Sequence, residues 1–330
     1  MNPNRRWLLS SFAAFAACAR KPQPPRKIVV QATPYITMAP LYLAQERGFF
    51  AAEDIELVLE ESQQSRETIP MLTTGRADVA FAAFSAGIVN AIAKGSRVRI
   101  VAGRERFGDN CGDGGALYVR KRKFPKGYSH APSWVGVHAQ VSTLAGYREF
   151  LHETLNEHFG LPPGAIVPEV LRNESALTAA ASGKIDILSG GSRPGYAGAD
   201  FMKDFERVMI LEQILPKFQY SYTLFGARLI DGDPRLGGSF LRALFRGVVA
   251  FQAGDTPTYL AEYAKRFKLD YNLVKTACRM DTSSDGGIDT ASLQAMVDWA
   301  VKKKYIETPV QATALIDPRF LDEARKAASK

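Results

Sequence analysis

The chain has 330 residues, 46% of them hydrophobic, so it is long enough for two domains with substantial buried cores. Its formal net charge is +8, from 42 lysines and arginines against 34 acidic residues. The basic residues are mostly scattered, and the densest cluster, residues 120–126, lacks the interleaved aromatic residues of a nucleic-acid site. We therefore expect no nucleic acid among the partners.

The first 26 residues have the features of an export signal. Arg5 and Arg6 precede an apolar run, residues 7–17, that is too short to span a bilayer and ends in small residues before Cys18. The segment resembles a bacterial lipoprotein box, in which the cysteine is lipidated. We expect a signal peptide over residues 1–17, lipidation at Cys18, a tether over residues 18–26, and a periplasmic or other extracytoplasmic location. An ordinary signal peptide cut nearby is the alternative, and the arginine pair also partly resembles a twin-arginine signal.

Short β-rich runs then alternate with helical segments. The sequence predicts strands at residues 28–30, 55–59, 78–82 and 98–103, and helices at 41–50, 65–74 and 85–94. Such alternation is typical of a mostly parallel sheet covered by helices on both faces.

A second α/β cycle follows. Strands are predicted at residues 116–119, 134–137, 166–167, 185–188, 207–211 and 220–225, with helices at 143–158 and 174–182. The remaining helices are expected at 234–253, 257–267, 271–278, 290–303 and 318–327. Residues 74–78 and 182–186 follow one plan, with glycine after a helix and aspartate before a strand, which indicates two similarly built lobes. The terminal helices are expected to pack back on the first lobe.

Residues 38–50, 55–57 and 74–80 carry a family resemblance. They resemble the sulfonate, taurine, nitrate and thiamine-pyrimidine binding proteins of ABC importers, the type often described as NMT1/THI5-like. The resemblance implies a type II periplasmic-binding-protein fold, with two α/β lobes of mostly parallel sheets, two crossover strands and hinge closure on a ligand. We expect lobe one over residues 27–118 and 226–330, lobe two over residues 119–225, and crossings near residues 117–120 and 222–227.

The expected ligand site lies beyond the carboxyl ends of the strands. Candidate residues in lobe one and the crossings are Tyr35, Thr37, Phe84, Ser85, Arg104 and Tyr222. Candidates in lobe two are Ser142, Thr143, Asn173, Ser192, Arg193 and Tyr196. Helix-start amides at Ser85 and Ser142 are expected to hold an anion, with Arg104 or Arg193 as its partner. The candidates to cover a ring are Tyr35, Phe84, Tyr196, Tyr220 and Tyr222, although each of them is also a candidate for the core. Arg193 is also a candidate for a surface ion pair.

The same lobes also occur in enzymes of pyrimidine-precursor and menaquinone synthesis, which leaves an enzyme as the alternative. The sequence has no cysteine cluster, nucleophile elbow or phosphate loop, and its four histidines are scattered, with only His138 considered as facing a ligand. Cys111 and Cys278 match no metal spacing, and whether they pair is left open. We expect a monomeric binding protein without catalytic residues, cofactor or metal. Its expected partners are a small ligand, an ABC permease and, through the lipid, a membrane.

Overall fold

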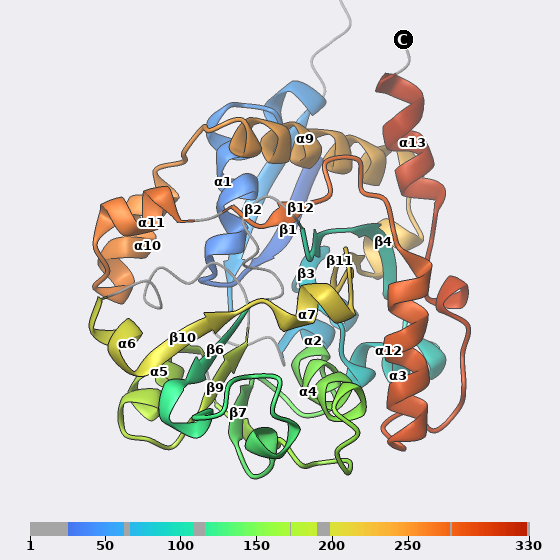
Figure 1. The fold of residues 1–330 in the computed structure, drawn as a ribbon. Coiled ribbons are helices and arrows are strands. Elements are labelled where there is room, and N and C mark those ends of the chain that lie inside the picture. The colour runs from blue at the N-terminus through green and yellow to red at the C-terminus, as the bar shows by residue number, and fades with distance from the viewer. Residues whose placement is uncertain are drawn as a thin grey trace, which may run out of the picture.

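The computed structural model describes residues 26–62, 67–108, 116–171, 173–189, 199–277 and 279–328. In these ranges the chain forms two five-stranded sheets, each flanked by helices, and Figure 1 shows one above the other. We call the first sheet with its helices lobe one and the second sheet with its helices lobe two. The predicted α/β class with two lobes is confirmed.

The first sheet has the spatial order β2-β1-β3-β11-β4. β1 pairs in parallel with β2 and β3, whereas β11 runs antiparallel between β3 and β4. The strands are β1 (Arg26–Ala32), β2 (Ile55–Glu61), β3 (Val79–Ala83), β4 (Arg99–Gly103) and β11 (Ser221–Phe225). Because β11 fills the slot between β3 and β4, residues 221–225 lie in the first sheet, outside the lobe to which the sequence assigned them.

The second sheet has the order β10-β6-β9-β7-β8. β7 is parallel to β8 and β9, and β6 is antiparallel to β9 and β10. The strands are β6 (Leu117–Arg120), β7 (His138–Val141), β8 (Val167–Val170), β9 (Ile187–Ser189) and β10 (Phe205–Val208). β5 (Glu105–Arg106) and β12 (Asp281–Thr282) form a separate small antiparallel pair.

The helices of lobe one are α1 (Ala39–Glu46), α2 (Thr68–Thr73), α3 (Ala86–Ala93), α8 (Ala227–Ile230), α9 (Pro234–Gln252), α10 (Tyr259–Phe267), α11 (Tyr271–Thr276), α12 (Thr290–Lys302) and α13 (Arg319–Ala328), with 3₁₀ turns η1 (Ile36–Met38), η2 (Ala51–Glu53) and η7 (Ala312–Leu315). Lobe two has α4 (Tyr147–His158), α5 (Asn173–Ala181), α6 (Ala199–Asp204) and α7 (Ile210–Ile214), with η4 (Lys121–Lys123) and η5 (Ala131–Trp134).

The strand predicted at residues 134–137 begins four residues later, as β7. Trp134 ends the 3₁₀ turn η5, and its indole Nε1 donates to the Tyr128 carbonyl at 2.9 Å. Gly136 then has a φ of 74°, which a β-strand does not allow. The apolar run is therefore a turn before the strand, with Trp134 and Val137 buried and Val135 exposed.

The repeated sequence plan places one aspartate at the same point of each lobe. The Asp78 amide donates to the Val29 carbonyl at 2.8 Å, and the Asp78 carboxylate accepts from the Val29 amide at 2.8 Å. In lobe two, Asp186 makes the same two contacts with His138, at 2.8 and 3.2 Å. Each aspartate therefore fixes the start of its strand against the first parallel strand of its own sheet.

Each of these buried carboxylates has an arginine partner. Asp78 pairs with Arg228, which follows β11, and the Arg228 Nε donates to its Oδ1 at 2.6 Å. Asp186 pairs with Arg120 at the end of β6, where both side chains are about 95% buried. Arg120 also donates to the carbonyls of Ala180 and Ile185 and so closes the end of α5.

The C-terminal helices pack as predicted on lobe one. α9 lies against α1, and α13 lies against α9 (Figure 1). Gly247 of α9 faces Pro40 and Ala44 of α1 so closely that a Cβ at this position would lie 2.4 Å from the Pro40 carbonyl oxygen. The absence of a side chain therefore sets the spacing of the two helices.

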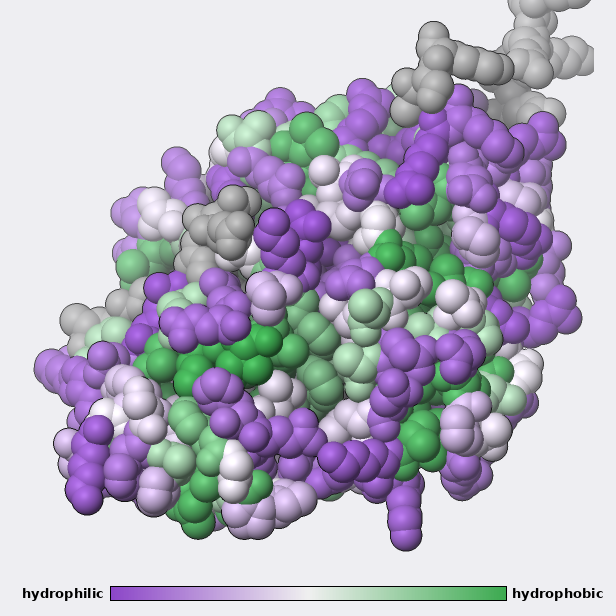
Figure 2. All heavy atoms as spheres, turned by 45° about the vertical axis from the view of Figure 1, so that its right-hand side comes forward, coloured by the Kyte–Doolittle hydropathy of each residue, from purple (hydrophilic) through white to green (hydrophobic). Residues whose placement is uncertain are grey.

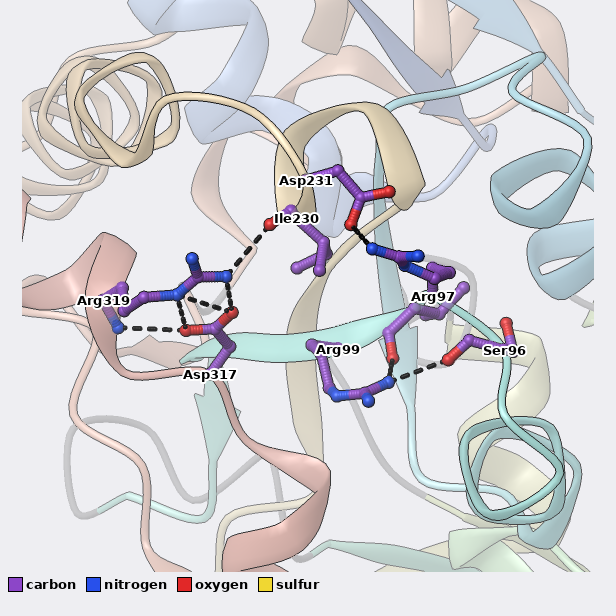
Figure 3. Close-up of polar contacts among 8 residues, drawn as sticks. Ser96, Arg97, Arg99, Ile230, Asp231, Asp317 and Arg319 are labelled. Carbon is purple, nitrogen blue, oxygen red and sulfur yellow. Dashed lines mark hydrogen bonds and ion pairs between the residues drawn. The ribbon is translucent and has the colours of Figure 1, made fainter.

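The outer edge of the first sheet is covered by the segment that leads into α13. The Asp317 amide donates to the Ile100 carbonyl of β4 at 2.9 Å. Figure 3 shows Arg319 paired with Asp317 and Arg97 paired with Asp231 at the end of α8. These contacts occupy an edge strand that would otherwise be open to pairing with another chain.

The largest apolar cluster among the described residues is continuous through both lobes. It includes Ile88 and Val98 of lobe one, and Phe150 of α4 in lobe two. Phe150 stacks on Phe218 with centroids 5.3 Å apart and meets Trp299 of α12 edge to face at 5.7 Å. The lobes therefore share a packed apolar connection beside the crossing segments.

Apolar side chains reach the described surface at separate places. Figure 2 shows green patches separated by hydrophilic residues on one face. Among the described residues, the exposed large apolar side chains are Val135, Leu144, Val170, Val249, Tyr271 and Leu273. No helix in the described part of the chain is long and apolar enough to cross a bilayer.

Candidate functional site

The carboxyl ends of β1, β3 and β4 lie at the edge of the first sheet that meets lobe two. Thr37 follows β1, Ser85 follows β3, and Arg104 follows β4. Ligands of open α/β sheets bind at such an edge, because loops and helix starts converge there. Thr37, Ser85 and Arg104 were predicted from the sequence because each of them follows one of these strands.

Arg104 is the buried cation of this edge. Its guanidinium donates to the Thr37 carbonyl at 2.9 Å and lies 4.0 Å from the centroid of the Phe81 ring. The side chain is only 7% exposed. Burial lowers the pKa of Arg104, against the opposing charge of Glu105. Two of the predicted residues, Thr37 and Arg104, are thus in direct contact.

Glu105 is the counter-charge of Arg104, and the sequence analysis missed it. One carboxylate oxygen, Oε1, lies 2.9 Å from the Arg104 guanidinium nitrogen, and the other accepts from the Ser221 hydroxyl. The Ser221 hydroxyl oxygen in turn accepts from the Glu105 amide at 3.0 Å. The available signal was a charged pair directly after the apolar strand β4.

Lobe two closes on this edge through main-chain contacts. The Ala86 amide at the start of α3 donates to the Ala145 carbonyl at 2.8 Å, and the Phe84 carbonyl accepts from the Tyr147 amide at 3.1 Å. Ser85, the N-cap of α3, makes no side-chain capping bond. One of the helix-start amides that the sequence offered to an anion is therefore occupied by the other lobe in this arrangement.

The prediction that Ser142 opens a helix is wrong. α4 begins at Tyr147 with Gly146 as its N-cap, because Ala145 has a φ of 57° and cannot continue a helix backwards. The Glu149 carboxylate accepts from the Ala145 amide at 2.7 Å and stabilises this late start. Ser142 therefore contributes its hydroxyl and not a helix-start amide.

Two aromatic rings meet where the lobes touch. Tyr147 of α4 stacks on Tyr220, with ring centroids 4.8 Å apart and planes inclined by 14°. Tyr220 is 5% exposed, and its hydroxyl donates to the Met280 sulfur at 3.8 Å. Burial, followed by the nearby Tyr147 and Glu105, raises the pKa of Tyr220. This pair is a flat apolar surface beside the Arg104–Glu105 pair.

Arg148 is the buried cation that lobe two brings to the same place. Its guanidinium donates to the Gln140 side-chain oxygen at 2.7 Å, to the Ser142 hydroxyl at 3.0 Å and to the Tyr147 hydroxyl at 3.1 Å. Arg148 is 6% exposed. Sequence reasoning missed it, because an arginine within an amphipathic helix ordinarily points to solvent.

His152 of lobe two is buried, and His138 lies at the amino end of its strand, away from the expected ligand edge. His152 is buried, with Nε2 2.8 Å from the Ser189 hydroxyl, and burial lowers its pKa to about 3. It is therefore neutral at physiological pH. His138 begins β7 and pairs with Glu169 at 2.8 Å, so it lies at the amino end of the strand, opposite the expected ligand edge.

Four other predicted ligand-binding residues are either buried in the core or make local contacts. Phe84 and Tyr222 are 3% and 1% exposed and belong to the shared apolar core, because neighbouring strands and helices enclose both rings. The Tyr35 carbonyl oxygen accepts from the Tyr259 hydroxyl at 2.9 Å, and the Tyr35 side chain is half-buried. Thr143 is exposed, and its hydroxyl donates to the neighbouring Leu144 carbonyl.

The remaining predictions lie outside the described residues. They are the signal peptide, Cys18 and most of the tether, Cys111, Ser192, Arg193, Tyr196 and Cys278. Asn173 is described only as the first residue of α5. Within the described ranges, no three metal-ligating side chains gather into a group that could hold a metal ion.

A small pocket adjoins the site. Thr37 lines it together with Ile36, Arg279 and Met280, and its volume is about 20 Å³. That is room for about one water molecule. The residues that line this pocket all come from lobe one, and a pocket of this volume is too small for an organic ligand.

Comparison with known proteins supports the sequence reading. Residues 36–104, the segment from η1 to Arg104, match the family model described as NMT1/THI5 like. The predicted resemblance is confirmed over this segment. No curated protein matches the sequence.

Solved structures extend the likeness to the whole fold. The ligand-binding component of an ABC-type import system from Staphylococcus aureus has 14% identity and a TM-score of 0.68, over 91% of this chain and 99% of that one. The alkanesulfonate-binding protein SsuA from Xanthomonas axonopodis has 14% identity and a TM-score of 0.68, over 90% and 100%. The nitrate-binding protein NrtA from Synechocystis has 13% identity and a TM-score of 0.66, over 92% and 89%. The chain therefore has the periplasmic-binding-protein fold.

Proposed function

We propose that this protein is the solute-binding component of an ABC importer, which captures a small organic anion between its lobes without chemical turnover. The observation that carries the proposal is the buried Arg104, which donates to the Thr37 carbonyl at the ligand edge of lobe one and lies near Tyr220, the residue that Tyr147 and Arg148 of lobe two also approach. Sulfonate and nitrate are the ligands named for two proteins of the same fold, and both are small oxyanions. An aromatic group on the ligand would find Tyr147 and Tyr220 as its cover.

We further propose the lobe boundaries that this function requires. Lobe one comprises residues 27–116 and 221–330, and lobe two lies between them. The support is the pairing of β11 with β3 and β4, and of β6 with β9 and β10. Arg193 stays a candidate second partner for the anion.

The test begins with the ligand itself. Small molecules released from denatured, natively purified protein are identified by mass spectrometry, and binding of that compound, ethanesulfonate and nitrate is measured by calorimetry. Arg104→Gln is expected to weaken binding about tenfold or more, since a desolvated charge-assisted contact is worth about 1.5–3 kcal/mol. Arg235→Gln is the matched control, because Arg235 is exposed and pairs only locally with Asp233.

Three results would count against the proposal. The first is unchanged affinity in both the Arg104→Gln and the Arg193→Ala variants when both are folded. The second is no binding of any of these compounds. The third is conversion of the bound compound to a product. The last result would favour the enzymes that share this fold.

We also propose that the mature protein is anchored to a membrane through a lipid on Cys18. The support is the apolar run before this cysteine and the proline-rich stretch after it. Cys18→Ser is expected to abolish fatty-acid labelling and to move the protein from the membrane fraction to the soluble fraction. Labelling and fractionation identical to the unmodified protein would contradict the anchor.

A further inference from the structure

Glu105 is a buried carboxylate whose place beside Arg104 matters for any anionic ligand. The residue is 4% exposed, and its Oε1 has no hydrogen-bonding geometry to any partner, although it lies 2.9 Å from the Arg104 nitrogen. Its Oε2 is held by the Ser221 hydroxyl. One oxygen of a nearly inaccessible carboxylate is thus held by charge attraction without a hydrogen bond.

The surroundings of Glu105 define its charge balance. Arg104 faces it from the β4–β5 junction, Tyr220 from the segment before β11, and Tyr147 and Arg148 reach the same cluster from α4. The next side chain, Arg106, turns outward to pair with Asp281 of β12 at 2.8 Å. The Arg104–Glu105 pair is therefore electrically neutral as a unit.

An anion that binds Arg104 disturbs this neutrality. The cation would then face two negative groups in a site from which water is largely excluded, and like charges in such a site strongly disfavour each other. Burial already raises the pKa of the Glu105 carboxyl, against the lowering effects of Arg104 and a backbone amide. When Arg104 pairs with the ligand, the main effect that lowers the pKa of Glu105 is weakened.

We infer that Glu105 couples ligand capture to the uptake of one proton. This rests on the proposed function. One proton from solvent adds to the Glu105 carboxylate as the monoanionic ligand replaces it at Arg104, so the charge summed over Arg104, Glu105 and the ligand stays at zero. Oε1, which has no hydrogen bond now, can receive the proton, while the Ser221 hydroxyl keeps Oε2 in place.

The coupling has a definite sign. Ligand binding raises the pKa of Glu105, so affinity is greatest at low pH and falls as pH rises through the window between the pKa of the free protein and that of the complex. The slope approaches tenfold per pH unit when one full proton is taken up. Glu105→Gln mimics the protonated acid in shape and charge, and is expected to bind without this dependence.

The experiment is calorimetry of ethanesulfonate and nitrate binding between pH 5.5 and pH 8, in two buffers of different ionisation enthalpy at each pH. The unmodified protein is expected to take up a proton, with a maximum of one, and to lose affinity as pH rises. Glu105→Gln should take up none and should bind at pH 8 as tightly as the unmodified protein does at pH 5.5. Glu60→Gln is the control, because Glu60 is a half-exposed partner of Arg76 and should behave like the unmodified protein.

The outcomes separate the two claims. Binding with no proton uptake by the unmodified protein overturns the coupling and leaves the proposed function intact, and this measurement needs no variant to fold. Proton uptake that persists in a folded Glu105→Gln protein overturns the assignment to Glu105. Absence of binding by both compounds at every pH contradicts the proposed function and the coupling with it.

Discussion

Replacing Arg120 by methionine is expected to lower the free energy of unfolding by about 3–5 kcal/mol, the usual cost of breaking a buried ion pair. Methionine keeps the apolar stem of the side chain but removes the guanidinium group, which leaves the Asp186 carboxylate without its main partner. It also removes the donor to the Ala180 and Ile185 carbonyls. Lys123, 3.4 Å from the other oxygen of Asp186, compensates only in part because its side chain is 41% exposed.

Urea unfolding followed by circular dichroism measures this effect. Arg122→Met is the matched control two residues away, since Arg122 is exposed in the same turn, and it should change stability by less than about 0.5 kcal/mol. Equal effects of the two substitutions would show that the Arg120–Asp186 ion pair makes no special contribution to the free energy of unfolding. Adding Asp186→Asn to Arg120→Met should restore part of the loss, because no buried charge is then unpaired.

Replacing Gly247 by alanine is expected to destabilise the protein by about 2–3 kcal/mol, the cost of overpacking a close contact. The added Cβ would lie 2.4 Å from the Pro40 carbonyl oxygen, a backbone atom of α1, and 2.6 Å from the Ala44 Cβ, which is bonded directly to the backbone of α1. Neither atom can turn away, so α9 must shift as a whole. The loss outweighs the gain of about 1 kcal/mol that alanine brings to a helix interior.

Gly87→Ala provides the comparison by the same substitution. Gly87 lies in α3, and a Cβ there would meet only the Ser85 hydroxyl, at 3.8 Å. We expect this variant to be neutral or slightly more stable in thermal unfolding. If Gly247→Ala were also neutral, the close approach of α9 and α1 would not be set by this glycine.

The sequence predicted the repeated parts of the fold because they follow local chemistry. The glycine and aspartate before β3 and β9 recur in residues 74–78 and 182–186. Both aspartates make the same contacts with a parallel strand of their sheets, β1 in lobe one and β7 in lobe two. The partners of these aspartates were not predictable. Arg228 follows Asp78 by 150 residues, and Arg120 precedes Asp186 by 66, so only the folded chain brings them together.

The site was predicted where strand ends sufficed and missed where helix contacts were needed. Thr37 and Arg104 follow strands and lie together as their positions suggested. Arg148 was missed, because its burial depends on where α4 begins, and that start is set by the positive φ of Ala145. No periodic pattern of apolar residues reports such a backbone angle.

The position of β11 between β3 and β4 has a consequence during synthesis of the chain. Residues 221–225 are synthesised after the whole of lobe two, yet β3 and β4 are hydrogen-bonded to this strand as their common neighbour. Until β11 emerges from the ribosome, the sheet that carries Arg104 lacks the strand between β3 and β4. The amides and carbonyls of β3 and β4 that face this gap are then unpaired. A nascent chain cut short before residue 221 should thus be a substrate for chaperones and proteases, while lobe two has by then all the strands of its own sheet.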